Sequence, residues 1–427
     1  MTTPSTASGP PPATNLIGIA AKRIVTCDPQ RATADDPLGV VHNGVIVYDG
    51  HSISWIGPRS GAAPDVPIVD HGERIVTPGL VDAHTHAAWV GSRHDEYVMR
   101  MAGADYRAIA AAGGGIVNSS RAVMAATEDE IADTLSARLG RMAALGVTTV
   151  EVKSGYGLEP DGERKQLRAI ARAARRTDLP NVVATYLALH ALPASAKTQR
   201  DYYVLRVATT MIPEIANAKL AQFVDAYVDQ NAFAVEEARL VCDAAKQHGL
   251  GVRLHVGQFA DIGGAQLCAE VGAKSADHVE NIDDDGIAAL AKAGIAAVLL
   301  PVASFTLGQD PPPVERLRAG GVSLVVASDA NPGTAPTESL PLAMALAVRM
   351  YGLTPAEAIL GATRHAAASL GLYGGGVTRP RGALVPGARA DLVVWDRDPY
   401  AVPPADLKEM RALLTVFNGA VVFEAKP

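Results

Sequence analysis

The chain has 427 residues, of which 48% are hydrophobic and 19% charged, and its formal net charge is −7. This composition excludes intrinsic disorder, because so many apolar residues can bury a sizeable core, and the length is typical of about two to three domains. The charges are spread without basic clusters, which argues against nucleic acid as a partner. No apolar run reaches the roughly 18 residues of a membrane-spanning helix, so we expect no membrane association. A small molecule is the expected ligand.

Three cysteines, Cys27, Cys242 and Cys268, lie far apart in the sequence. Their number and spacing fit neither a disulfide framework nor a zinc ribbon, which predicts a reducing, cytoplasmic location. Residues 1–14 lack the basic and apolar stretches of a targeting signal, so we expect them to be a disordered leader. We also expect the chain to form a homodimer.

Short β-type runs separated by turn residues occupy both ends of the chain. The N-terminal runs are IGIAAKRIVT, GVIVYDG, HSISWIG and RIVT, and the C-terminal runs lie in ALVPGARADLVVWD and ALLTVFNGAVVFEA. This pattern is typical of a small antiparallel sheet. We therefore expect residues 15–77 and 378–427 to form one β-sandwich domain around a central insertion.

In the central segment, residues 78–377, apolar runs alternate with amphipathic helical stretches such as KQLRAIARAARR and AVEEARLVCDAAKQHG. The eight runs are GLVDAH, TTVEVK, VVATYLAL, QFVDAYV, GVRLHV, KSADHV, AAVLLP and SLVVAS. Alternation of this kind indicates parallel strands with crossover helices. Eight such units predict an α/β fold of the (β/α)8 TIM-like barrel type, and an open doubly wound sheet is the alternative.

Polar residues stand at or just after the C-terminal end of nearly every predicted strand, although buried parallel strands carry few of them. In chain order they are His84, His86, Lys153, Tyr156, His190, Asp229, Gln230, His255, Gln258, His278, Asp329 and Asn331. In a barrel these strand ends converge on one face, where the active sites of such enzymes lie. The sequence therefore predicts a polar site on that face.

His84 and His86 are two residues apart on a strand, which places both imidazoles on the same side. An isolated His-Thr-His is more often structural, but His255 and Asp329 follow at the ends of the fifth and eighth runs and can reach the same ion. Three histidines and one aspartate suit a single divalent metal ion, zinc or iron. Such an ion lowers the pKa of a bound water molecule, which can then attack a carbonyl or amidine carbon.

Proton transfer in this hydrolysis needs a base and an acid close to the water. We expect Asp329 to take the proton of the water and to return it to the leaving nitrogen. His278, at the end of the sixth run, is expected to orient the water or to stabilise the developing oxyanion.

Several longer motifs carry a resemblance to a known family. TPGLVDAHTH, KSGYGLE, SADHVE and SDANPGTAPTESLP occur in this order, and the chain resembles the amidohydrolase superfamily over nearly its whole length. Narrower motifs, among them Gly91-Ser92-Arg93, AGGGI from Ala112 and His190-Ala191-Leu192-Pro193, are similar to those of the imidazolonepropionase family within it. The resemblance implies a metal-binding (β/α)8 barrel flanked by a β-sandwich.

The resemblance also implies a ligand set and a reaction. It puts the metal on His84, His86, His255 and Asp329, substrate contacts on Arg93, Tyr156, His190 and Gln258, and the product end on Asn331, Gly333 and Thr334. The implied reaction is hydrolysis of 4-imidazolone-5-propanoate to N-formimidoyl-L-glutamate in histidine degradation. The planar guanidinium of Arg93 suits the propionate carboxylate. Alternatives are hydrolysis of another cyclic amide, deamination of an amino-heterocycle, or a binding protein that has kept the barrel and lost catalysis.

Two positions depart from the family pattern. Gln258 stands where the family usually has glutamate, and Asp229 follows Val228 where the family usually has Cys-Glu. An amide cannot act as a base, so the proton chemistry is expected to rest on Asp329 and His278. Lys153 lies at the second run, inside the KSGYG motif, and we expect it to be ion-paired rather than carbamylated as a bridge between two metals.

Overall fold

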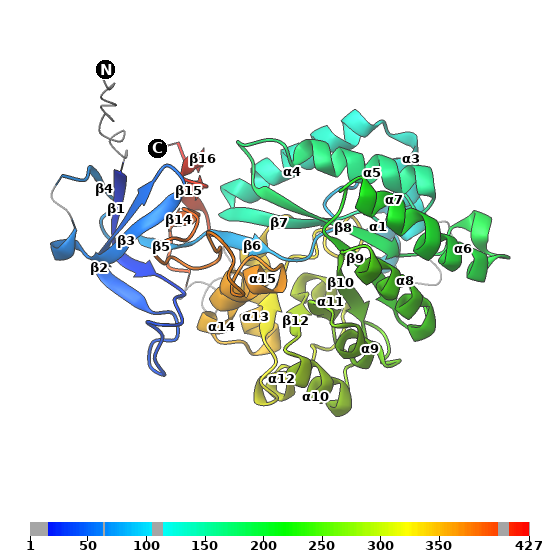
Figure 1. Ribbon diagram of the computed structural model, residues 1–427. Coiled ribbons are helices and arrows are strands. Elements are labelled where there is room, and N and C mark those ends of the chain that lie inside the picture. The colour runs from blue at the N-terminus through cyan, green and yellow to red at the C-terminus, as the bar shows by residue number, and fades with distance from the viewer. Residues whose placement is uncertain (1–15, 63–64, 105–113, 400–409, 427) are drawn as a thin grey trace, which may run out of the picture.

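The computed structural model describes residues 16–62, 65–104, 114–399 and 410–426. A barrel of parallel strands surrounded by helices occupies most of the molecule, and a second sheet lies against one side of it (Figure 1). The expected leader, residues 1–14, lies outside the described residues, as does the beginning of the AGGGI motif. None of the described helices is long and apolar enough to cross a bilayer.

All eight predicted runs form strands of one parallel sheet. The strands are β6 (Leu80–Asp82), β7 (Val147–Lys153), β8 (Asn181–Leu189), β9 (Phe223–Val228), β10 (Gly251–Val256), β11 (Ser275–His278), β12 (Ala296–Leu299) and β13 (Leu324–Val326). They pair in sequential order from β6 to β13, which is the order of a barrel and not of a doubly wound sheet. The prediction of a (β/α)8 barrel is confirmed.

The barrel closes between β6 and β13 at the ends that carry the polar residues. Thr85 and Ala330 form a parallel bridge there. The backbone N–H and the hydroxyl of Ser328 both donate to the Asp82 carboxylate. These contacts bring the segment after β13 beside the segment after β6. Asp329 is thereby placed near His84 and His86.

Helices connect the strands and cover the outside of the barrel (Figure 1). They are α1 (His94–Met101), α3 (Ile116–Ala125), α4 (Glu128–Ala144), α5 (Pro160–Ala173), α6 (Arg200–Arg206), α7 (Ile212–Asn217), α8 (Val235–Gln247), α9 (Gly264–Val271), α10 (Asp284–Ala293), α11 (Pro301–Leu307), α12 (Val314–Ala319), α13 (Leu340–Tyr351), α14 (Pro355–Gly361) and α15 (Arg364–Ser369). Capping residues fix their ends. Thr127 and Glu130 form a capping box at the start of α4, and Gly249, at φ 74°, follows α8.

The two ends of the chain form the second sheet, as predicted. Its strands are β1 (Leu16–Val25), β2 (Val40–Asp49), β3 (Ser52–Pro58), β4 (Ile68–Asp70), β5 (Ile75–Pro78), β14 (Leu392–Trp395), β15 (Ala412–Phe417) and β16 (Ala420–Glu424). The order is β16-β15-β14-β5-β1-β2-β3, with β4 on β1, so the antiparallel pair β5–β14 joins the two ends. Pairs β1–β4 and β1–β5 are parallel.

Trp395 packs this sheet against the barrel. Its side chain is buried, and its indole N–H donates to Thr77 Oγ1 over 2.8 Å. Gly146, just before β7, lies beneath the ring, because a Cβ atom there would meet Trp395 at 2.5 Å. The contact is therefore close enough that only glycine fits, and it fixes β7 against the terminal sheet.

Candidate metal centre and active site

Three histidines, two from the segment after β6 and one from β10, converge at the C-terminal face of the barrel. His84 and His86 follow β6, and His255 lies in β10. Their candidate ligand atoms lie within 4.8 Å of one another, and all three side chains are buried. Asp329 completes the group, with its Oδ1 at 3.5 Å from His84 Nε2 and 3.6 Å from His86 Nε2.

Buried carboxylates fix two of these imidazoles from behind. His84 Nδ1 lies 2.7 Å from Asp277 Oδ2, and His255 Nδ1 lies 3.0 Å from Asp225 Oδ2. His84 Nδ1 donates to Asp277, so its ring presents the lone pair of Nε2 to the centre, while Asp225 lies beside His255 as an ion-pair partner. Burial, together with neighbouring positive groups, also lowers the pKa of His84, His86 and His255 well below the usual value. The three rings are therefore neutral, as metal ligands must be.

These donors fit a divalent cation. His255 Nε2 lies only 3.3 Å from His86 Nε2, and His84 Nε2 is buried without a hydrogen-bond partner among the described residues. Lone pairs that face one another across so short a distance repel unless a proton or a cation lies between them. Three imidazole nitrogens and a carboxylate oxygen are the donor set that zinc or iron accepts.

A buried ion-pair network lies beneath the centre. Lys153 Nζ lies 2.9 Å from Glu151 Oε1 and 2.8 Å from Asp225 Oδ2, and the Lys153 side chain is fully buried. Arg253 Nη2 lies 3.5 Å from Asp277 Oδ2. The two cations thus compensate the carboxylates that orient the histidines. The predicted ion-paired role of Lys153 is confirmed.

Asp329 and His278 have backbone conformations that side chains rarely adopt. Asp329 has a φ of 55° and His278 a φ of 83°, and such values persist only where the surrounding structure enforces them. Burial raises the pKa of the Asp329 carboxyl to about 7, although His278 and Asn331 oppose this. For His278, burial opposes the charged form, but the Glu280 carboxylate at 3.5 Å raises the pKa of the imidazole overall.

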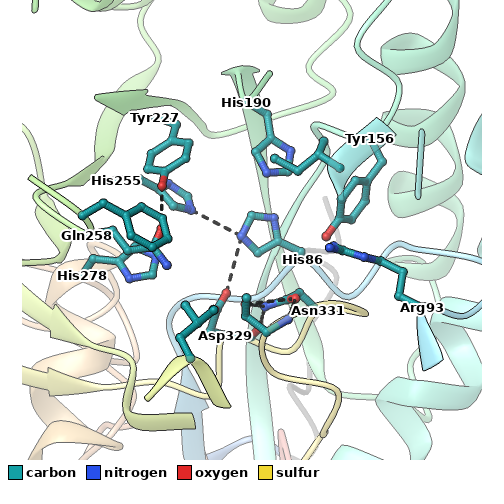
Figure 2. Close-up of a pocket in the computed structure, with 14 residues that line it drawn as sticks. His86, Arg93, Tyr156, His190, Tyr227, His255, Gln258, His278, Asp329 and Asn331 are labelled. Carbon is teal, nitrogen blue, oxygen red and sulfur yellow. Dashed lines mark hydrogen bonds and ion pairs between the residues drawn. The ribbon is translucent and has the colours of Figure 1, made fainter. Parts of the chain in front are cut away.

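A cavity opens onto the centre, and most of the predicted site residues line it (Figure 2). The lining residues are His86, Arg93, Ile116, Tyr156, His190, Tyr227, His255, Gln258, Phe259, His278, Leu307, Asp329, Asn331 and Thr334. Gly333 and His84 are not among the lining residues, but Gly333 lies against Arg93 and the ring centroid of His84 lies 5.4 Å from that of His86. Gln230 is exposed and does not join the site.

Arg93 is held by residues at its own end of the cavity. Its Nε and Nη2 lie 2.8 and 2.7 Å from Glu96 Oε2, and Asn118 Nδ2 donates to the other Glu96 oxygen over 3.1 Å. A Cβ atom on Gly333 would lie 2.2 Å from Arg93 Nη1, so a larger residue there would displace the guanidinium from this position. Figure 2 shows the guanidinium beside the Tyr156 hydroxyl.

Tyr156 and His190 form the wall next to His86. Burial raises the pKa of the Tyr156 phenol, which therefore remains a hydrogen-bond donor. His190 Nδ1 lies 2.8 Å from the Gly155 carbonyl oxygen, so the proton sits on Nδ1 and Nε2 remains an acceptor. Burial lowers the pKa of His190 to about 4, and its ring stacks on His86 at 5.2 Å.

Asn331 organises the loop after β13. Its Oδ1 accepts hydrogen bonds from the backbone N–H groups of Gly333 and Thr334 at 2.8 and 2.7 Å. Its Nδ2 donates to the Asp329 carbonyl at 2.7 Å and to Thr334 Oγ1 at 2.9 Å. The amide therefore links Asp329 to the glycine on which Arg93 rests.

Four lining residues were not predicted from the sequence, namely Ile116, Tyr227, Phe259 and Leu307. Tyr227 had a usable signal, because it lies two residues after Asp225 in β9 and so shares its inward face. Asp229 itself does not line the cavity, and its Oδ2 accepts a hydrogen bond from the backbone N–H of Phe259 at 2.9 Å. Ile116 and Leu307 carry no local signal, since they reach the cavity from helices α3 and α11.

Comparison with known proteins agrees with this architecture. A family model described as "Amidohydrolase family" matches residues 108–423. An adenosine deaminase from Xanthomonas campestris with bound zinc shares the fold, with a TM-score of 0.68 at 17% identity over 95% of this chain and 92% of that chain. Fold, histidine cluster and family model together define an amidohydrolase.

Curated relatives identify the family within the amidohydrolases to which the chain belongs. Imidazolonepropionases from Mesorhizobium japonicum and Caulobacter vibrioides are each 44% identical to the chain. The first alignment covers 84% of this chain and 88% of the relative, and the second covers 88% and 92%. The chain belongs to the imidazolonepropionase family.

Proposed function

We propose that the protein hydrolyses 4-imidazolone-5-propanoate to N-formimidoyl-L-glutamate, the ring-opening step of histidine degradation. The observation that carries the proposal is one cavity with the three-histidine centre and Asp329 at its base and Arg93 on its wall. Family membership at 44% identity supports the same reaction. The proposed substrate is a ring with an anionic tail, and the cavity presents separate sites for the two parts.

His84, His86, His255 and Asp329 are the residues that would hold one divalent ion, zinc or iron. When bound, the ion supplies Lewis acidity toward water and toward the substrate carbonyl oxygen. The ligand atoms already converge, and Asp277 already fixes the tautomer of His84. The protein therefore binds the ion with little rearrangement of its own side chains.

Asp329 is the proposed base and acid. It takes a proton as the water oxygen attacks the ring carbonyl carbon, and it gives a proton to the ring nitrogen as the C–N bond breaks. Burial raises the pKa of the Asp329 carboxyl, which favours uptake of the proton in the first of these steps. His278 faces the same space and donates a hydrogen bond to the oxygen on which negative charge develops.

Arg93 and Tyr156 are proposed to hold the propionate tail. The guanidinium and the phenol supply donors, and Glu96 fixes the guanidinium in place. His190 and Gln258 are proposed to contact the ring, and Asn331, Gly333 and Thr334 shape the end of the cavity toward which the product extends. The carboxylate is thereby bound away from the bond that breaks.

We further propose that the protein works in the cytoplasm as a homodimer, without nucleic acid. Its cysteines Cys27, Cys242 and Cys268 are free and buried, which supports a reducing compartment. Sedimentation velocity at several concentrations tests the dimer.

The proposed division of the chain into domains is a barrel domain at residues 78–377 and a terminal β-domain at residues 15–77 and 378–427.

A substrate panel tests the proposed activity. Purified protein loaded with zinc or with iron(II) is given 4-imidazolone-5-propanoate, other cyclic amides and amino-heterocycles, and metal content is measured on the same samples. We expect turnover of imidazolonepropionate with one ion per chain. Hydrolysis or deamination of another member of the panel, with imidazolonepropionate untouched, would replace the proposed substrate while keeping the metal centre.

A further inference from the structure

Tyr227 and Gln258 form a hydrogen-bonded pair on the wall of the cavity. The Tyr227 hydroxyl donates to Gln258 Oε1 over 2.7 Å, and both residues line the cavity (Figure 2). A carboxamide has one acceptor oxygen and a nitrogen with two donor hydrogens. The bond to Oε1 orients the amide, so that its N–H group is the free donor that Gln258 can offer to a ligand.

The main chain around Gln258 is held on both sides. Asn281 Nδ2 and Gln309 Nε2 donate to the Gln258 carbonyl at 2.9 and 3.0 Å. The next backbone N–H, that of Phe259, donates to Asp229 at 2.9 Å. With the backbone fixed, the remaining freedom of Gln258 is rotation of its side chain, and this is the freedom that the bond to Tyr227 removes.

Tyr227 is itself fixed relative to the metal centre. It lies in β9 two residues after Asp225, and the alternation of the strand directs both inward. Asp225 holds His255, and the Tyr227 ring lies 5.8 Å from the His255 ring. The position of the Tyr227 hydroxyl is thus tied to the strand that orients a metal ligand.

We propose that Tyr227 is a positioning residue that sets substrate specificity through Gln258, by holding the Gln258 amide with its N–H toward the bound ring. The site then selects a ring that turns a hydrogen-bond acceptor, a carbonyl oxygen or an unprotonated nitrogen, toward this wall. A ring with a donor there leaves two donors face to face, and such a mismatch is heavily penalised in a water-poor site. The identity of the substrate rests on the proposed function, whereas the positioning role of Tyr227 rests on the geometry of its pair with Gln258.

A double-mutant cycle on 4-imidazolone-5-propanoate tests it. Tyr227→Phe deletes only the hydroxyl, and Gln258→Met replaces the amide with an apolar group of similar length. We expect Tyr227→Phe to raise KM roughly three- to tenfold, the cost of one neutral hydrogen bond, with kcat changed less than about twofold. In the Gln258→Met background the same change should alter KM by less than about twofold, because there is no amide left to position.

Tyr203→Phe is the matched control, since the Tyr203 hydroxyl donates to the Leu158 carbonyl at 3.0 Å away from the cavity lining. It should leave KM unchanged. An equal rise in KM in both backgrounds of the cycle would overturn the inference, because Tyr227 would then act on the substrate directly. So would a loss confined to kcat.

A crystal structure of Tyr227→Phe tests the pair without any substrate. We expect Gln258 to occupy more than one rotamer there, while Asn281, Gln309 and Asp229 keep their bonds to the main chain. One unchanged Gln258 rotamer would overturn the inference even if the native protein were active. Native protein without turnover of imidazolonepropionate, but with Gln258 released in the variant, would instead contradict the proposed function and leave the positioning role standing.

Discussion

The base of the cavity and its wall are built in different ways. The base consists of strand-borne and strand-end residues, His84, His86 and His255, and buried carboxylates lie behind two of them, His84 and His255. The wall consists mainly of residues on loops, such as Arg93 and Tyr156, each held by its own local partners. The difference separates chemistry from recognition. A base of this kind can bind a metal ion whatever the substrate is. The wall determines which ring and which tail fit above it.

The largest expected effect is at the base. Asp329→Asn removes a proposed metal ligand and the proposed base at once, and we expect kcat to fall by about 10³-fold or more. Metal content per chain and kcat should be measured together, with circular dichroism as the control for folding. Activity within about tenfold of the native protein, with metal retained, would show that another group moves the proton.

The network beneath the base is expected to matter for stability. Lys153→Met leaves Glu151 and Asp225 buried without their closest cation, and we expect the free energy of unfolding to fall by about 3–5 kcal/mol. Urea unfolding followed by fluorescence measures this. The control is Lys292→Met on the surface of α10, which should stay within about 0.5 kcal/mol of the native value. Equal stability of the two variants would show that the buried network contributes little to folding.

Much of the base could be predicted from the sequence, because a period of two along a strand fixes which side chains share a face. His84 with His86 is such a case. The partners that complete the base come from distant segments: Asp277 reaches His84 across 193 positions, and Asp82 binds Ser328 across 246. No local pattern encodes these contacts.

The wall was harder to predict than the base, because most of its residues lie on loops. Arg93 was identified only through the family resemblance, since isolated loop residues carry no periodic signal, and Tyr156 and Asn331 were placed near the site by the strands that they follow but received a role only from the resemblance. Tyr227 was not predicted, although it shares a face with Asp225 on its strand. An apolar strand pattern predicts that a residue is buried but does not show whether its side chain points into the barrel or toward the helices. The structure adds Glu96 and Gly333 as the residues that position Arg93.

Arg93→Ala tests recognition at the wall. Loss of a charge-assisted hydrogen bond costs about 1.5–3 kcal/mol, which corresponds to a rise in KM of about 10- to 150-fold with a smaller change in kcat. Because Glu96 already neutralises much of the guanidinium charge, we expect a value near the lower end. Steady-state kinetics on imidazolonepropionate measures it, and an unchanged KM would mean that the tail is bound elsewhere.

Gly333→Ala provides a milder version of the same test. The backbone of Gly333 suits any residue, so the only conflict is between the new methyl group and the Arg93 guanidinium. We expect KM to rise in the same direction but by less than in Arg93→Ala, and the two changes together to cost no more than Arg93→Ala alone. Additive effects would show that Gly333 acts on the substrate rather than through Arg93.

The smallest expected effect concerns the departure at Gln258. If Asp329 is the working base, Gln258→Glu should leave the shape of the pH–rate profile intact and change kcat/KM by less than about tenfold, because a new carboxylate at the wall adds no proton transfer that the base lacks. Native protein and variant should be compared from pH 6 to 9, roughly the range in which a carboxyl with a raised pKa and a histidine titrate. If the carboxylate were instead essential, the native protein would be inactive on imidazolonepropionate and the single change would create activity. That result would leave the base as described and reassign the substrate, since the difference between the two proteins lies only in a wall residue that binds the ring.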